Sequence, residues 1–116
     1  MTSNQIALKF CKLASKNGLR TGYRVKHNHR LLSAVVYNPD DKNEVSLIIR
    51  IFPYKIDNPD HPLLMTRRML NMKKFNTPIL VIGGIEQVET AVQTIKRDIK
   101  TKYIKLNEPK IILLAG

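Results

Sequence analysis

Cysteine and aromatic residues are scarce in this sequence, and tryptophan is absent. Cys11 is the only cysteine among 116 residues, which excludes an internal disulfide and a zinc site built from cysteines. Because Cys11 falls among the apolar positions of an expected helix, we predict a buried, unreactive thiol. A reducing location, cytoplasmic or otherwise intracellular, is consistent with this usage. Aromatic residues make up 6% of the chain, which gives little support to a surface on which unpaired bases stack.

Long apolar runs are also missing. No stretch approaches the ~18 residues that a membrane-spanning helix needs, and the first residues lack the charged-then-apolar pattern of a signal peptide. We therefore expect no membrane partner. Hydrophobic residues make up 43% of the chain and charged residues 25%, as in ordinary globular proteins. A chain of this length can bury its own core, so we predict a single domain over residues 1–116.

Acidic residues are few: 9 Asp and Glu stand against 20 Lys and Arg, which gives a net charge of +11. Such an excess destabilises the compact chain through self-repulsion and creates a field that attracts anions. Nucleic acid offsets this repulsion, because neutralised phosphates release their condensed counterions. Anionic lipid, an acidic protein or a basic surface without a ligand are the alternatives. Nucleic acid is the partner that we expect.

The distribution of charge is more informative than its total, because residues 1–39 contain no acid. This segment carries seven bases: Lys9, Lys12, Lys16, Arg20, Arg24, Lys26 and Arg30. A solvated surface normally mixes both signs, so we expect the first helix and first hairpin to form a continuous positive strip that contacts a phosphate backbone. A second basic group follows later in the chain: Arg67, Arg68, Lys73 and Lys74.

Residue patterns predict an α/β (α+β) fold with the order α-β-β-β-α-β-α-β. The expected helices span residues 2–17, 62–74 and 85–102, and the expected strands span residues 21–27, 30–37, 44–52, 78–82 and 111–114. Ser3 is the expected N-cap of the first helix and Gly18 its stop. Residues 38–43 are expected to form a turn. Three antiparallel strands followed by a parallel β-α-β unit would make a mixed sheet.

The order of elements over residues 2–84 resembles the core of the PD-(D/E)XK nuclease superfamily, which includes archaeal Holliday-junction-resolvase-like enzymes. That family places an acid on the second strand and an acid-x-lysine on the third, where the carboxylates hold Mg²⁺ and the lysine positions the nucleophile. Here Ser33 stands where the second strand needs an acid, and no acid lies two positions before Arg50. The resemblance therefore implies a nuclease-like fold that binds nucleic acid without cutting it, and without a cofactor.

A metal-dependent nuclease is the enzymatic alternative, with Mg²⁺ or Mn²⁺ as its cofactor. Five of the nine acids lie in one part of the chain and could converge with His61: Asp40, Asp41, Glu44, Asp57 and Asp60. Pro39 and Asp40 match the "PD" element superficially, but the simpler interpretation of residues 38–43 is a polar turn. A third hypothesis is an assembly subunit, such as a homo-oligomer, that associates through an apolar face of the Leu- and Met-rich second helix.

Overall fold

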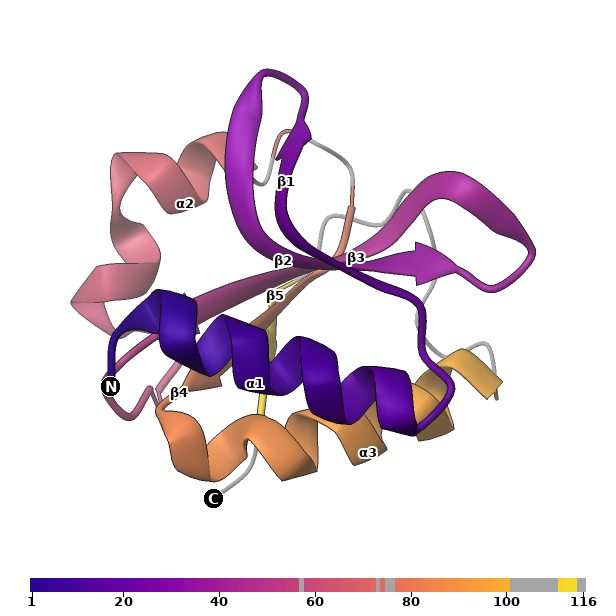
Figure 1. Cartoon of the computed structure of the whole chain (residues 1–116). Coiled ribbons are helices and arrows are strands. Elements are labelled where there is room, and N and C mark those ends of the chain that lie inside the picture. Colours follow the sequence, from indigo (N-terminus) through magenta and orange to yellow (C-terminus); the bar gives the residue numbers. More distant parts are fainter. Residues whose placement is uncertain (57, 73, 75–76, 101–110, 115–116) are drawn as a thin grey trace.

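The computed structural model describes residues 1–56, 58–72, 74, 77–100 and 111–114. Its sheet has five strands in the order β1-β2-β3-β4-β5 (Figure 1). The strands are β1 (Thr21–His27), β2 (Arg30–Asn38), β3 (Asp41–Phe52), β4 (Ile79–Gly83) and β5 (Ile111–Leu113). The first three pair antiparallel, whereas β4 runs parallel to both β3 and β5. The predicted fold class and order of elements are confirmed.

The N-cap of helix α1 (Ser3–Lys16) is Thr2, one residue before the predicted cap Ser3. The Thr2 hydroxyl accepts a hydrogen bond from the Gln5 amide (3.2 Å), and the Gln5 side chain accepts one from the Thr2 amide (2.8 Å). This reciprocal capping box is available to Thr2 and not to Ser3, because it needs Gln5 three residues later. Gly18, with a φ of 81°, ends the helix as predicted.

The turn between β2 and β3 is shorter than predicted. Asn38 pairs with Asp41, which leaves only Pro39 and Asp40 between the strands. The Asp40 amide donates to the Asn38 side chain (2.9 Å), a local bond that favours a tight turn. Polar residues 41–43 therefore belong to β3, since backbone pairing does not require apolar side chains at an exposed hairpin end.

The predicted second helix is divided into a 3-10 turn, η1 (Pro62–Met65), and a short helix, α2 (Arg67–Met72). Thr66 separates them with extended backbone angles, and its hydroxyl accepts a hydrogen bond from the Met69 amide (3.4 Å). A threonine that caps the next helix ends the preceding turn. The third predicted helix likewise begins as a 3-10 turn, η3 (Ile85–Gln87), before α3 (Val88–Lys100). Its predicted end at residue 102 lies outside the described residues.

Two apolar layers cover the sheet. Helices α1 and α3 lie side by side on one face, where they pack on Leu47, Ile49 and Ile51 (Figure 1). The segment of η1 and α2 covers the other face, above Ile48 and Phe52. Successive strand residues point to opposite faces, so Arg50 belongs to the α2 side, between two buried apolar residues. A cation at this position of a central strand is the exception in an otherwise apolar layer.

Cys11 lies on the buried side of α1, as predicted. Burial raises the pKa of its thiol, and a hydrogen bond involving Thr21 partly opposes that rise. No helix in the described part of the chain is long and apolar enough to cross a bilayer.

Candidate nucleic-acid interface

The seven bases of the acid-free segment all have exposed side chains. None of them forms an ion pair with a carboxylate that the structure describes. By contrast, Asp98 of α3 pairs with Arg97 at 3.0 Å. The charge of the first third of the chain is therefore left available to an external anion.

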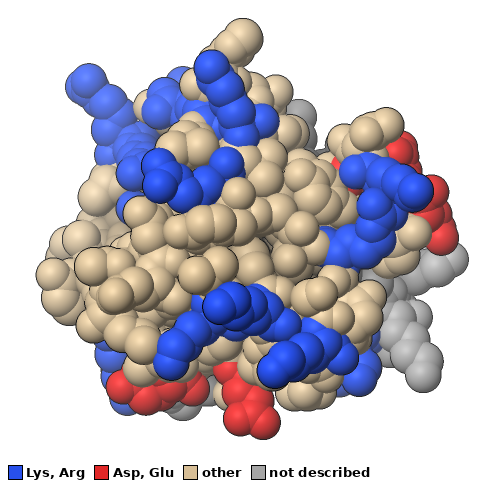
Figure 2. Space-filling model, viewed as in Figure 1, with Lys and Arg blue, Asp and Glu red and all other residues tan. Residues whose placement is uncertain are grey.

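Figure 2 shows Lys and Arg side chains over α1 and over the β1–β2 hairpin, on the same face of the molecule. Uncharged surface separates the two groups, so they do not form the continuous strip that we expected. Lys9, Lys12 and Lys16 recur at helical spacing along the exposed side of α1. The end of the β1–β2 hairpin extends away from this helix (Figure 1), so the basic residues of the hairpin lie apart from the lysines of α1.

Two arginines of the second basic group lie next to the hairpin, although the two segments are far apart in the sequence. Arg67 and Arg68 of α2 line a hollow of about 560 Å³ together with Arg30 and His29 of the hairpin. A guanidinium nitrogen of Arg68 donates to the Leu31 carbonyl at 3.4 Å, which links the two elements. Lys74 is exposed beyond α2, and Lys73 lies outside the described residues.

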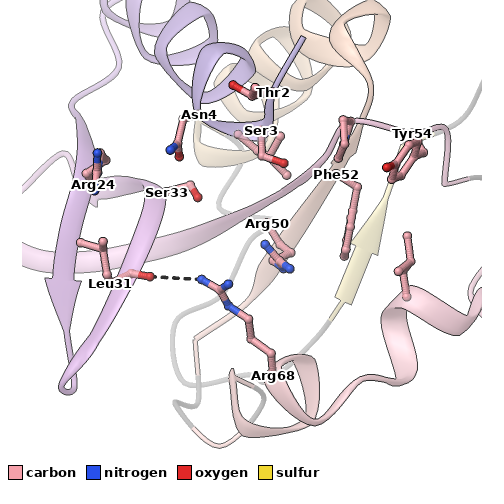
Figure 3. A pocket seen from close by; sticks show the side chains of 13 residues that line it. Thr2, Ser3, Asn4, Arg24, Leu31, Ser33, Arg50, Phe52, Tyr54 and Arg68 are labelled. Atoms are coloured by element: carbon pink, nitrogen blue, oxygen red, sulfur yellow. Dashed lines mark hydrogen bonds between the residues drawn. The ribbon is translucent and has the colours of Figure 1, made fainter.

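A second hollow, of about 620 Å³, adjoins the first at Arg68 (Figure 3). We call it the arginine pocket, because Arg24 of β1, Arg50 of β3 and Arg68 of α2 all line it. The remaining lining comes from the start of α1, from β2 and from the end of β3 with the loop and η1 that follow: Thr2, Ser3, Asn4, Leu31, Ser33, Ile51, Phe52, Pro53, Tyr54 and Leu63. No described lining residue is acidic.

Arg50 is the least solvated charge of the pocket. Its guanidinium carbon lies 4.5 Å from the centre of the Phe52 ring, a cation–π contact. Its Nε is buried and has no hydrogen-bond partner within the described structure. Burial, and then the nearby charge of Arg68, lower the pKa of Arg50 to about 10, so the side chain remains charged at neutral pH. A buried charged donor without an acceptor is costly, and an anion in the pocket would remove this cost.

Arg24 is positioned by an unusual backbone. It has a φ of 55° in the middle of β1, where an extended residue is expected. Its neighbours Tyr23 and Val25 pair with Ala34 and Leu32 of β2 in an unchanged register, whereas Arg24 itself is left out of the pairing. Strained residues of this kind concentrate at binding sites.

The acids that could form a nuclease site occupy separate places. Asp40, Asp41 and Glu44 lie in the β2–β3 hairpin, before or within the first residues of β3, whereas Asp60 lies in the loop that follows the end of this strand. Among the described residues, no three His, Cys, Asp or Glu side chains gather into a group that could hold a metal ion. Asp57 lies outside those residues.

Most of the apolar side chains of η1 and α2, the segment that we expected to associate with a partner, are buried inside the protein. Leu64, Met69 and Met72 are buried in the core. Met65 and Leu70 are the large apolar side chains that η1 and α2 leave exposed.

Sequence reasoning missed the arginine pocket, although one signal was present. Arg50 is the single charge within the apolar run 45–52, and its neighbours predict that it faces a buried layer. Tyr54 and the start of α1 carried no comparable signal. No family model, curated protein sequence or solved structure matches the chain, so no relative supplies a function for it.

Proposed function

We propose that this chain is a non-catalytic nucleic-acid-binding protein that contacts the phosphate backbone through the lysine and arginine side chains of α1, the β1–β2 hairpin and α2. One observation carries the proposal. The seven bases of residues 1–39 are exposed, and none has an ion-pair partner among the described carboxylates. A surface of this kind is the electrostatic footprint of a phosphate backbone.

Two kinds of contact would contribute. The lysines of α1 are flexible point charges on a convex surface, so they attract phosphates without fixing a geometry. Arg30, Arg67 and Arg68 line a concave surface, where planar guanidinium groups can bind phosphate oxygens in pairs. Both contacts position a backbone and neither reads a base, so we expect weak sequence selectivity.

The resemblance to the PD-(D/E)XK superfamily enters the proposal as a nuclease-like fold that has lost its catalytic groups. In support, Ser33 and Arg50 line the same pocket, where that family would need a carboxylate and a lysine. The pocket residues that the structure describes include no carboxylate. The described lining of this pocket therefore offers no carboxylate ligand for the Mg²⁺ that would activate the attacking water.

Fluorescence anisotropy with random-sequence duplex and single-stranded oligonucleotides tests the proposal. We expect the logarithm of the affinity to fall linearly with the logarithm of the salt concentration, with a slope of about −0.9 per duplex phosphate contacted. A flat salt response, or no binding at low salt, would refute a backbone-binding function.

A matched pair of double variants locates the surface. Lys9→Glu/Lys12→Glu changes the exposed side of α1, whereas Lys42→Glu/Lys96→Glu changes exposed lysines on elements that also carry acids. Each Lys→Glu exchange removes two charges, so both double variants lower the net charge from +11 to +7. We expect the α1 variant to lose affinity about tenfold or more, with a shallower salt slope, and the control to lose much less. Equal losses would show that total charge matters and the surface does not.

Incubation with branched, duplex and single-stranded substrates in Mg²⁺ or Mn²⁺ tests the absence of catalysis. We expect binding without cleavage. Cleavage that disappears in Asp40→Ala or Asp57→Ala would replace the proposal with the metal-dependent nuclease.

A further inference from the structure

We propose that the arginine pocket binds a phosphate monoester, the group that terminates a phosphorylated nucleic-acid strand. This inference rests on the proposed function only for the source of the phosphate. A free mononucleotide carries the same group, so the experiments below distinguish the two sources.

The charge of the pocket fits a terminal phosphate better than a backbone phosphate. Arg24, Arg50 and Arg68 approach from three different elements, and no acid in the described lining competes for them. A backbone diester carries one negative charge, whereas a monoester carries about −1.5 to −2 at pH 7 and presents three acceptor oxygens. Three guanidinium groups around one hollow match the monoester in both charge and number of acceptors.

The state of Arg50 points to the same ligand. Figure 3 shows its guanidinium at the centre of the pocket, close to that of Arg68. Two like charges side by side repel each other, and Arg68 contributes to the lowered pKa of Arg50. An anion between them would remove the repulsion and provide an acceptor near the buried Nε of Arg50.

The start of α1 adds a second source of positive potential. The capping box satisfies the amides of Thr2 and Gln5. Ser3 and Asn4 also line the pocket, and their amides have no hydrogen-bond partner in the described part of the chain. No acid lies in the first turn of this 14-residue helix. Free amides at a helix N-terminus favour an anion, so they reinforce the arginines.

The pocket is larger than a phosphate group requires. Its volume of about 620 Å³ is typical of small-molecule sites, which span roughly 300–1,000 Å³. In Figure 3 Tyr54 lies on the side opposite Arg24, with Arg50 between them. Tyr54 is 64% exposed and is not part of the core. It offers an aromatic face for the terminal base, since such stacking is independent of base identity.

The position of the pocket favours a strand end over a free nucleotide. Arg68 lines both the arginine pocket and the neighbouring hollow, where Arg30 and Arg67 stand. A strand whose terminal phosphate occupied the arginine pocket could place its next phosphates against these two arginines. A free mononucleotide would leave them without a ligand.

The first experiment compares three labelled single-stranded oligonucleotides of identical sequence: one with 5′-hydroxyl and 3′-hydroxyl ends, one with a 5′-phosphate and one with a 3′-phosphate. We expect the wild-type protein to bind one phosphorylated oligonucleotide about tenfold more tightly than the unphosphorylated one, because a dianion meets three arginines. Arg50→Gln and Arg68→Gln should each abolish this preference. Lys42→Gln removes one charge far from the pocket lining and should retain it.

The second experiment does not depend on nucleic-acid binding. Adenosine 5′-monophosphate and inorganic phosphate are each compared with chloride at equal ionic strength, and the thermal midpoint is measured. We expect both to raise the midpoint of the wild type and of Lys42→Gln, and neither to raise that of Arg50→Gln or Arg68→Gln. Circular dichroism establishes that each variant is folded, and Arg68→Gln serves if Arg50→Gln is not.

The outcomes separate the two proposals. A strand-end preference that requires Arg50 supports the pocket with a strand end as its source. Stabilisation by the mononucleotide that requires Arg50, without any end preference, supports the pocket with a free nucleotide as its source. Equal binding of all three oligonucleotides together with no Arg50-dependent stabilisation overturns the inference and leaves the proposed function intact. Failure of every oligonucleotide to bind at low salt overturns the proposed function alone.

Discussion

The lysine side of α1 and the arginine pocket carry charge of the same sign in opposite surroundings. Lys9, Lys12 and Lys16 are exposed on a convex helix surface, where water and salt screen them. Arg50 lies half-buried against Phe52, with a lowered pKa and an unsatisfied Nε. Net charge therefore describes only the first region. The second is a small number of charges held at fixed positions by the fold, at some cost in stability.

Raising the salt concentration from 50 to 200 mM should give the largest contrast between the two regions. If six or more phosphates are contacted, the affinity for unphosphorylated duplex should fall by ~1,000-fold or more. The preference for a phosphorylated single strand, measured as a ratio of affinities in the same anisotropy assay, should change far less because the pocket is partly shielded from ions. A preference that decays as steeply as the affinity would mean that the pocket acts as ordinary surface charge.

Replacing Tyr54 should have the next largest effect, and only on ligands that carry a base. Tyr54→Ala should weaken binding of the phosphorylated strand by about tenfold, in the range expected for the loss of one base–aromatic stack, while Tyr54→Phe should retain it. Stabilisation by inorganic phosphate should be the same in both variants. Loss of the phosphate effect in Tyr54→Ala would place the tyrosine in the anion site itself.

Arg50→Met should make the protein more stable in the absence of phosphate, by roughly 1 kcal/mol, because an apolar chain of similar length replaces a half-buried charge. Urea unfolding in a chloride buffer measures this difference. The folded pKa of about 10 lies below the ordinary value of an arginine, so the stability deficit of the wild type is complete below about pH 10 and shrinks as the pH rises above it. Phosphate should reduce the difference by stabilising the wild type alone. A less stable Arg50→Met would mean that the arginine serves the fold.

The smallest expected effect concerns α1, the helix that carries the lysines, and is measured through the reactivity of the Cys11 thiol. Its buried thiol, with a raised pKa, should react slowly with a disulfide reagent at pH 8 in the folded protein and rapidly in urea. Nucleic acid should leave the slow rate unchanged, because the lysines bind from the outside of a helix that remains docked. A faster reaction on binding would show that α1 moves away from the sheet.

Local patterns predicted the order of elements, the mixed sheet and the burial of Cys11, because apolar periodicity and turn residues act over a few positions. The errors arose where two local interactions of similar strength compete for the same backbone groups. Thr2 formed the capping box that Ser3 could not, Thr66 divided a segment that was expected to form one helix, and Asn38 stabilised a tighter turn.

The candidate site was predicted only in part. The bases of residues 1–39 were visible as a charge pattern, and their exposure follows from the cost of burying a charge. The meeting of Arg24 and Arg68 across the sequence could not be predicted, because no local rule specifies which face of the hairpin α2 covers.

Three properties can be read from the order of residues alone: the excess of positive charge, its concentration away from carboxylates and the alternation that turns Arg50 toward a buried layer. Two further properties depend on how the chain folds: α2 returns to the β1–β2 hairpin, and the first turn of α1 lies near the end of β3 at the same pocket. Charge and periodicity are properties of the chain itself. A pocket, by contrast, is defined by contacts between distant segments, and these depend on how the apolar layers pack.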